Sequence, residues 1–268
     1  MIFFLLAVGI AAGIIAGLLG LGGGIIFTPV MFIIFSEAGV ENPTLWTIGS
    51  GLLCSGIAAT GSVVRQKAQN NLFLKESLLV GVLGTTGVFL GKLVITAPFY
   101  SRTVFVIVFT ILLIFSSVMM FLRGRDKQNE EERSYKPLGA GSSLVTGGIG
   151  GFIAALAGVG GGAIMVPIMN LIYKQPFKKT VSISSFAIVL ITFFGAFQLA
   201  IQSGATAGLT EYTIGYVDYG ASLPLIIGGI SGGFLGAYLN HKIDRKLLQW
   251  GFSALALFMA IRLIWDII

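Results

Sequence analysis

The sequence feature that most constrains the fold is a glycine-broken hydrophobic segment that occurs twice. The first copy, residues 13–33, reads GIIAGLLGLGGGIIFTPVMFI, and the second, residues 151–171, reads GFIAALAGVGGGAIMVPIMNL. At a constant offset of 138 residues, the two copies are identical at 11 of 21 positions. An internal repeat of this kind decides the architecture before any local pattern does. We therefore interpret the chain as a duplication.

The composition places this duplication in a lipid bilayer. Hydrophobic residues make up 55% of the 268 residues and charged residues only 10%, whereas water-soluble globular proteins carry about 25% charged residues. The net charge of +6 comes from basic residues in short loops between apolar runs, a placement typical of membrane proteins and not of nucleic-acid binding. The single cysteine, Cys54, provides no disulfide framework, and we expect it to be a small packing residue. Long apolar runs indicate helices and not barrel strands.

The apolar runs divide the chain into two membrane repeats and a linker. The first repeat, residues 1–122, holds a broken segment at 2–35 followed by spans at 43–64, 77–95 and 102–122. The second, residues 137–268, holds a broken segment at 137–173 followed by spans at 180–202, 217–239 and 247–267. Residues 123–136, RGRDKQNEEERSYK, are predicted to be a cytoplasmic linker. Because one crossing takes about 20 residues, each broken segment is predicted to be a hairpin with a short second limb.

Loop charges indicate that the two repeats have opposite orientations. The loops rich in lysine and arginine, at 65–75, 123–136, 174–179 and 242–246, are expected in the cytoplasm, and those at 36–42 and 203–216 outside. One hairpin plus three crossings in each repeat inverts the second copy, because three is odd. The predicted fold is an all-α membrane protein of two inverted repeats, each a glycine-broken helical hairpin plus three transmembrane helices. This makes roughly 8–10 membrane segments, depending on whether the hairpins cross fully, and it is the architecture of many secondary transporters.

The glycine breaks are the candidate binding site. A broken helix leaves backbone groups unpaired, which the bilayer core tolerates only where the break is buried in protein or lines a water-filled cavity. Amides and positive dipole ends at the start of both second limbs are expected to hold one anion between them. The glycines concerned are Gly22, Gly23 and Gly24 in the first copy and Gly160, Gly161 and Gly162 in the second. The alternative is that these glycines only let helices cross closely.

Other side chains in and near the breaks are further candidates. Pro29 and Pro167, about a turn and a half into the second limbs, are expected to bend or shorten them. Ser50 and Ser184 occupy corresponding positions of the two copies, and their hydroxyls are predicted to donate to an oxyanion. Bonding to a backbone carbonyl one turn earlier is at least as common a role for a hydroxyl in a helix. The other polar residues inside these two spans are Thr47, Ser55, Thr60, Ser182, Ser185, Thr192, Gln198 and Gln202.

The titratable residues disfavour catalysis. The chain has no nucleophile–base pair, no metal-ligand set and no Gly-Lys-Ser/Thr phosphate loop, so neither an enzyme nor a cofactor is expected. No charged residue is predicted at mid-span: Asp218 and Glu211 are expected to be solvated loop residues, and Lys179 to lie in a basic loop. Without a buried counter-ion, the membrane potential itself favours export of a monoanion by about 2.3 kcal/mol per 100 mV.

The motifs together resemble a known family. The paired segments GLLGLGGGIIFTPVM and ALAGVGGGAIMVPIM, with Val217-Asp218-Tyr219 before the glycine-rich stretch GGISGGFLGA at 228–237, resemble the sulfite exporter TauE/SafE family, also called TSUP. This resemblance spans nearly the whole chain and implies transport of sulfur-containing anions such as sulfite, sulfonates or sulfoacetate, in either direction. The first repeat departs from the motif, because Asn71-Leu72-Phe73 stands where the second has Val217-Asp218-Tyr219. Any role of the acid is therefore not duplicated.

We expect a multi-pass transporter of the cell membrane that moves a small sulfur-containing anion, such as sulfite or a sulfonate, by alternating access. An anion channel, or a transporter of another small oxyanion, is the alternative within membranes, and an intramembrane enzyme or scaffold is disfavoured. The expected partners are the small anion and membrane lipid, without nucleic acid. The residues leave open the direction of transport, a coupling ion and the formation of a homo-oligomer.

Overall fold

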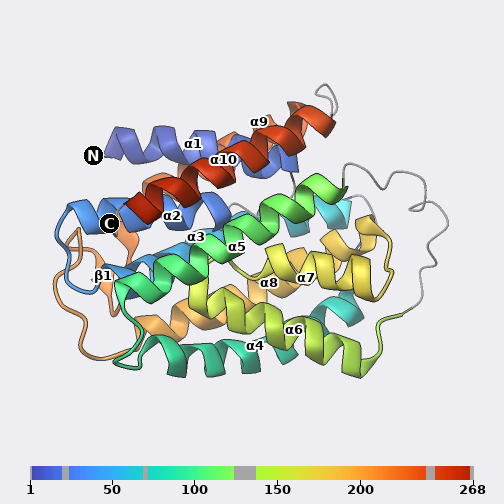
Figure 1. Cartoon of the computed structure of the whole chain (residues 1–268), viewed down its shortest axis with the longest axis horizontal. Helices are drawn as coiled ribbons and strands as arrows, with labels where there is room; N and C mark the ends of the chain where they lie inside the picture. The colour runs from blue at the N-terminus through green and yellow to red at the C-terminus, as the bar shows by residue number, and fades with distance from the viewer. Residues whose placement is uncertain (1, 20–23, 69–71, 124–136, 240–244, 266–268) are drawn as a thin grey trace.

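The chain folds into a bundle of helices that run mostly along one direction (Figure 1). The computed structural model describes residues 2–19, 24–68, 72–123, 137–239 and 245–265. The first half contributes α1 (Ile2–Leu19), α2 (Gly24–Glu37), α3 (Pro43–Ala68), α4 (Leu74–Ile95) and α5 (Arg102–Arg123). The second half contributes α6 (Ala140–Ala157), α7 (Gly162–Pro167), the π-helical turn η1 (Ile168–Ile172), α8 (Phe177–Ala200), α9 (Tyr219–Leu239) and α10 (Arg245–Trp265). Extended structure in the described ranges is limited to an antiparallel hairpin of β1 (Thr213–Ile214) and β2 (Val217–Asp218).

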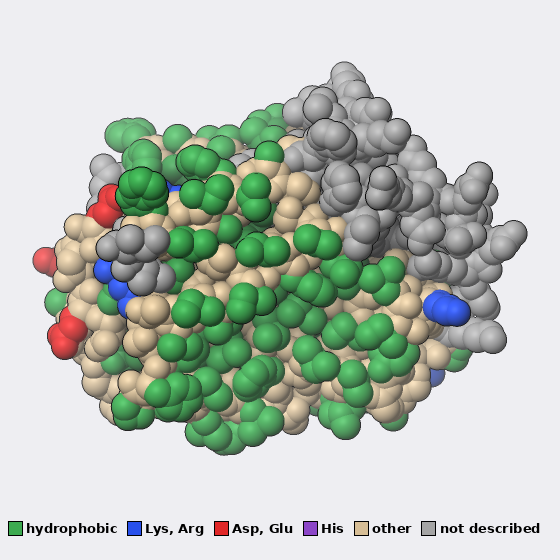
Figure 2. Space-filling view, viewed as in Figure 1, with side chains coloured by type: hydrophobic (Ala, Val, Ile, Leu, Met, Phe, Trp, Pro, Cys, Tyr) green, Lys and Arg blue, Asp and Glu red, His purple; other side chains and the backbone are tan. Residues whose placement is uncertain are grey.

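The lengths of the helices fit a lipid bilayer. By length and composition, five helices of the described part can each cross a membrane: Pro43–Ala68, Leu74–Ile95, Arg102–Met119, Ala140–Ala157 and Lys179–Ala200. Shorter apolar helices accompany them, among them Gly24–Glu37 and Gly162–Ile172. Hydrophobic side chains cover much of the face in Figure 2, and acidic side chains gather at its left-hand end. The predicted all-α, multi-pass membrane fold is confirmed.

Both broken segments divide at their glycines. α1 ends at Leu19 and α2 begins at Gly24, whereas α6 ends at Ala157 and α7 begins at Gly162. Residues 20–23, which include the predicted site residues Gly22 and Gly23, lie outside the described residues, as does most of the predicted linker, residues 124–136. The second limbs differ in form, because α2 is one helix of 14 residues and α7 has six residues before η1 continues it.

Helices of the first half pack against helices of the second half in matching pairs. α1 packs along α9 and α4 along α6, while α3 packs on α8 and α5 on α10. If the number of each helix is raised or lowered by five, the pair α1–α9 becomes the pair α6–α4. Under the same change, the pairs α3–α8 and α5–α10 remain the same pairs. α3 and α8 run antiparallel, since Gly56 faces Thr192 while Leu52, earlier on α3, faces Gly195, later on α8.

Glycines on the helix faces make the closest of these pairings. A Cβ added to Gly147 of α6 would collide with the carbonyl of Val80 on α4, and one added to Gly13 of α1 would collide with the carbonyl of Gly229 on α9. Small residues let helices in lipid approach closely enough for such backbone contact. These glycines on regular helices therefore allow close helix crossing, and a Cβ added to Gly161 of the second break would likewise collide with the carbonyl of Gly150.

Two charged residues depart from the sequence-based expectation. Asp218, expected to be solvated, is fully buried, because the β1–β2 hairpin places it at the start of α9 where it accepts a hydrogen bond from the Ala221 amide at 2.9 Å. Lys179, expected in a loop, lies in the first turn of α8 and is 1% exposed. Lys179 can be buried because Glu76 of α4 pairs with it at 2.7 Å. The expectations that Asp218 is solvated and that Lys179 lies in a loop are therefore wrong, whereas neither residue lies at the middle of a span.

Candidate functional site

The second glycine break is a tight turn that requires glycine. Gly158, Gly160 and Gly161 have φ values of 69°, 76° and 75°, in the left-handed region that side-chain-bearing residues rarely adopt. Gly158 ends α6 as its left-handed C-cap, donating to the Ala154 carbonyl at 2.8 Å, and Gly161 lies just before α7. All the residues from Gly158 to Gly162 are buried. The local sequence Gly-Val-Gly-Gly-Gly thus reverses the chain inside the bundle.

Hydroxyl groups from the first half of the chain hold this turn. Thr28 Oγ1, in α2, donates to the Gly158 carbonyl oxygen at 2.9 Å, and Ser55 Oγ, in α3, donates to the same oxygen at 3.5 Å. Both side chains are fully buried. The end of α6 leaves carbonyls without helical partners, and here α2 and α3 supply the donors. The turn in the second half of the chain therefore depends on side chains of the first half.

The start of α2 reaches the same place. Gly24 is buried, and a Cβ added to it would lie 2.8 Å from the carbonyl oxygen of Val159 and would also collide with the hydroxyl of Ser55. The structure therefore brings Gly24 together with Gly160, Gly161 and Gly162, as the sequence analysis expected of the two breaks. We name this region, formed by Gly24 and residues 158–162, the glycine junction.

Thr192 of α8 contacts the glycine junction with its methyl group. A Cβ on Gly160 would lie 3.1 Å from Thr192 Cγ2, whereas Thr192 Oγ1 faces Gly56 of α3. Thr192 is fully buried, and its hydroxyl donates to the Ile188 carbonyl of its own helix at 2.7 Å. The hydroxyls that bond to the junction are therefore those of Thr28 and Ser55. Among the described residues, the amides of the turn segment 159–161 donate to no backbone carbonyl.

The two serines selected from the sequence lie elsewhere. Ser50 Oγ accepts a hydrogen bond from the Asp218 amide at 3.0 Å, and so it joins α3 to the start of α9. Ser184 Oγ donates to the Val181 carbonyl of its own helix at 3.1 Å. Both serines are buried, and neither has a hydrogen bond to the glycine junction among the described contacts. Sequence reasoning missed Thr28, although it lies inside the repeated motif, because Val166 stands at the corresponding position of the second copy.

The two prolines differ in their surroundings. Pro29 is buried inside α2, which continues past it to Glu37. Pro167 is the last residue of α7, and the chain continues as η1, where the Tyr173 amide donates to the Ile168 carbonyl five residues earlier. A proline lacks the amide that would bond the preceding turn, so the wider π-helical turn follows naturally from Pro167.

The chemistry of the glycine junction is polar but uncharged. Its described groups are backbone amides, backbone carbonyls and the hydroxyls of Thr28 and Ser55. No cluster of three or more His, Cys, Asp or Glu side chains that could hold a metal ion occurs in the described ranges. Cys54 is buried beside the carbonyl of Ser222 and, as expected, acts as a packing residue. Amides and hydroxyls are groups that can orient a small polar solute without bonding it covalently.

The apolar spans and the all-helical bundle define a multi-pass α-helical membrane protein. The sulfite exporter TauE/SafE family matches residues 5–263 of this sequence, so the chain belongs to the TauE/SafE family. Transport, and not enzymatic catalysis, is the activity of this family.

Relatives with curated descriptions extend over the same length. A probable membrane transporter protein of Methanocaldococcus jannaschii is 30% identical over 247 residues, covering 91% of this chain and 88% of the relative. A probable membrane transporter protein of Haemophilus influenzae is 26% identical over 273 residues, covering 98% and 97% of the two chains. The probable membrane transporter protein YunE of Bacillus subtilis is 26% identical over 281 residues, again covering 98% and 97%. No solved structure matches this chain significantly.

Proposed function

We propose that the protein is a secondary transporter of small sulfur-containing oxyanions, such as sulfite or sulfonates, and that the glycine junction is its substrate site. The observation that carries the proposal is the meeting of α2, α3, α8 and the turn at 158–162 in one buried, uncharged, hydroxyl-lined place. The name of the family supports the choice of a sulfur oxyanion. The amides of residues 159–161, which donate to no backbone carbonyl among the described residues, are donors that suit such an anion, and the hydroxyls of Thr28 and Ser55 can join them by releasing the Gly158 carbonyl. The described residues of the junction include no carboxylate that would repel an anion.

The junction suits alternating access because both halves of the chain build it. Gly24, Thr28 and Ser55 belong to the first half, whereas the turn at 158–162 and Thr192 belong to the second. The matching pairs of helices from the two halves, and the antiparallel pairing of α3 and α8, support the proposal of two inverted repeats, residues 1–122 and 137–268. Rocking one repeat against the other then opens the junction to each side in turn.

Transport in proteoliposomes tests the proposal. Purified protein is reconstituted, a potassium gradient with valinomycin sets the potential, and uptake of ³⁵S-labelled sulfite and of a labelled sulfonate is measured. We expect saturable uptake that rises with a potential attracting the anion. Unsaturable flux with electrical conductance would favour an anion channel, and no flux of either anion under any potential would contradict the proposal.

Substitution of the lining hydroxyls tests the site. Thr28→Val and Ser55→Ala each remove one hydroxyl with little change of volume. A hydrogen bond to a charged group contributes about 1.5–3 kcal/mol, so each change should lower kcat/KM for sulfite roughly 10- to 100-fold. Thr60→Val, which removes a hydroxyl from the exposed side of α3, is the matched control and should transport normally. Normal transport by both folded variants would remove the glycine junction as the site.

A further inference from the structure

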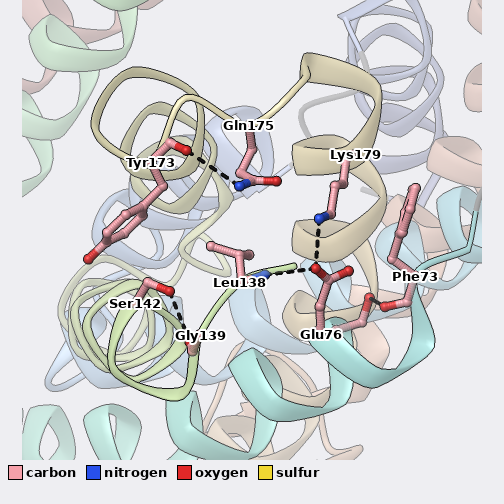
Figure 3. Close-up of polar contacts among 9 residues, drawn as sticks. Phe73, Glu76, Leu138, Gly139, Ser142, Tyr173, Gln175 and Lys179 are labelled. Carbon is pink, nitrogen blue, oxygen red and sulfur yellow. Dashed lines mark hydrogen bonds and ion pairs between the residues drawn. The ribbon is translucent and has the colours of Figure 1, made fainter. Parts of the chain in front are cut away.

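A buried charged cluster lies away from the glycine junction, where the starts of α4, α6 and α8 meet (Figure 3). Lys179 Nζ lies 2.7 Å from Glu76 Oε1, and the amide of Leu138 donates to the same oxygen at 2.9 Å. The Lys179 side chain is 1% exposed and the Glu76 side chain 14%. An ammonium group and a backbone amide thus converge on one carboxylate oxygen. Glu76 belongs to the first half of the chain, and its two donors belong to the second.

Such a pair is not explained by stability alone. Removing two charges from water costs several kcal/mol per ion, and the mutual attraction often only offsets this cost. Lys179 lies in the first turn of α8, so its buried charge lies near one end of the helix bundle and not at mid-span.

We propose that Lys179 and the Leu138 amide form a second oxyanion subsite, which the carboxylate of Glu76 occupies when no substrate anion is bound. A carboxylate and a sulfite or sulfonate present similar charged oxygens, and both accept charge-assisted hydrogen bonds from an ammonium and an amide. Lys179 is sealed in the protein, whereas Glu76 is the more exposed partner. Glu76 is therefore the group that leaves when an external anion enters.

The exchange keeps the local charge balanced. An anion that replaces Glu76 beside Lys179 leaves the ammonium neutralised, so no unpaired charge is buried during the exchange. Lys179 also lies over the ring of Phe73, with Nζ 5.5 Å from the ring centroid, and this contact holds the cation in place after Glu76 departs.

Gln175 provides an additional polar group at the subsite. Its residue is 5% exposed, its Oε1 has no hydrogen-bond partner among the described residues, and its Nε2 makes one long bond of 3.4 Å to the Tyr173 carbonyl. Figure 3 draws Gln175 in the same close-up as Lys179 and Glu76, on the segment that leads into α8, with its hydrogen bond to Tyr173. A carboxamide can present either its oxygen or its NH₂ group, so Gln175 can offer donors to an entering oxyanion.

The subsite and the glycine junction lie on the same helix, α8, but on different faces of it. Lys179 pairs with Glu76 of α4, whereas Thr192 faces Gly56 of α3, about 140° away around the helix axis. Lys179 and Thr192 are 13 residues apart, which is about 20 Å along a helix. This inference rests on the proposed function, because it makes the subsite a station for the same anion at the basic end of its path.

Equilibrium dialysis of ³⁵S-labelled sulfite against the purified full chain in detergent tests the subsite. Glu76→Gln removes the internal competitor, which acts at high effective concentration, so we expect sulfite to bind at least about tenfold more tightly than to the wild type. Adding Lys179→Met to Glu76→Gln should abolish this gain. The matched control is Glu37→Gln, which breaks the exposed pair of Glu37 with Arg262 and should bind sulfite like the wild type.

Two outcomes would overturn the proposal: unchanged sulfite affinity in folded Glu76→Gln, or a gain that persists without Lys179. If Glu76→Gln does not fold, Lys179→Arg and Lys179→Met in the otherwise wild-type chain decide, since the arginine variant should bind sulfite like the wild type and the methionine variant more weakly. A wild type that moves no sulfite while Glu76→Gln gains affinity through Lys179 would refute the proposed function and leave the subsite. A wild type that transports sulfite, with no gain of affinity in Glu76→Gln, would support the proposed function and refute the subsite.

Discussion

The buried carboxylate of Asp218 accepts hydrogen bonds from a residue that its neighbours in the sequence do not indicate. Its Oδ1 accepts a hydrogen bond from Thr210 Oγ1 at 2.6 Å, and its Oδ2 accepts one from the Thr210 amide at 2.9 Å. Thr210 lies eight residues earlier and reaches Asp218 only because the β1–β2 hairpin folds back. One signal in the sequence could have revealed the role, because aspartate is a preferred residue just before a helix and Asp218 directly precedes α9.

Tyr100 allows a prediction about pH. Its hydroxyl donates to the Leu156 carbonyl near the end of α6 at 2.7 Å, and burial raises the pKa of this hydroxyl above its ordinary value. Because the pKa of Tyr100 is higher in the folded chain than in the unfolded chain, its neutral hydroxyl stabilises the fold. This contribution to the free energy of unfolding is complete below the unfolded pKa of about 10 and is lost as pH rises towards the folded pKa. Tyr100→Phe should therefore lower the free energy of unfolding by about 1 kcal/mol at pH 8.

Above pH 10, the wild type should lose its advantage over Tyr100→Phe by about 1.4 kcal/mol per pH unit. Denaturant unfolding in detergent between pH 8 and pH 11 measures this difference, and Tyr100→Phe is itself the reference that cancels the titration of all other groups. A difference between the two proteins that stays constant over this range would show that Tyr100 ionises equally in the folded and unfolded chains.

At the scale of the element, glycine does two different things in this bundle. In the turn at 158–161 it supplies left-handed backbone conformations, whereas on the faces of α1, α4, α6 and α9 it supplies close approach between helices. Hydropathy alone does not separate the two uses. The clustering of glycines in the doubled motif predicts the turn, and their spacing along regular helices predicts the packing.

Neighbouring glycines on α6 offer a matched test of helix packing. A Cβ on Gly147 would collide with the Val80 carbonyl of α4, but a Cβ on Gly148 would meet nothing within 4 Å. Gly147→Ala should destabilise the protein by about 1–3 kcal/mol because α4 and α6 must separate. Gly148→Ala should be neutral or stabilise α6 by up to about 1 kcal/mol. Thermal unfolding in detergent compares the two, and equal effects would contradict this account of the α4–α6 contact.

At the scale of the whole molecule, the loop charges predict which end faces the cytoplasm. Glu41 lies between α2 and α3 at one end, and Lys174 lies between η1 and α8 at the other. Both are exposed, whereas the native Cys54 is buried. A membrane-impermeant maleimide added to intact cells should therefore label Glu41→Cys and leave both Lys174→Cys and the wild type unlabelled. Labelling of Lys174→Cys from outside would reverse the orientation.

Much of the fold could be predicted because its determinants are visible in one dimension. Apolar length, the doubled glycine motif and loop charge each concern a short stretch of chain. The placement of hydroxyls could not be predicted in this way, because Ser50 and Ser55 lie on one helix about 140° apart around its axis. Only the packing against Gly158 and Gly24 decides that Ser55 faces the junction. The ion pair of Lys179 and Glu76 could not be predicted either, because its two members are far apart in sequence and only the folded chain brings them together.

The pairing of α1 with α9 also has a consequence for synthesis. Tyr219, where α9 begins, follows the end of α1 at Leu19 by 200 residues. The ribosome must therefore add almost the whole of the remaining chain before the first helix meets the neighbour against which its glycines pack. Until then, α1 has to remain at the translocon or in lipid with that face uncovered, so the first segment of the chain is packed only after its next-to-last helix has been inserted.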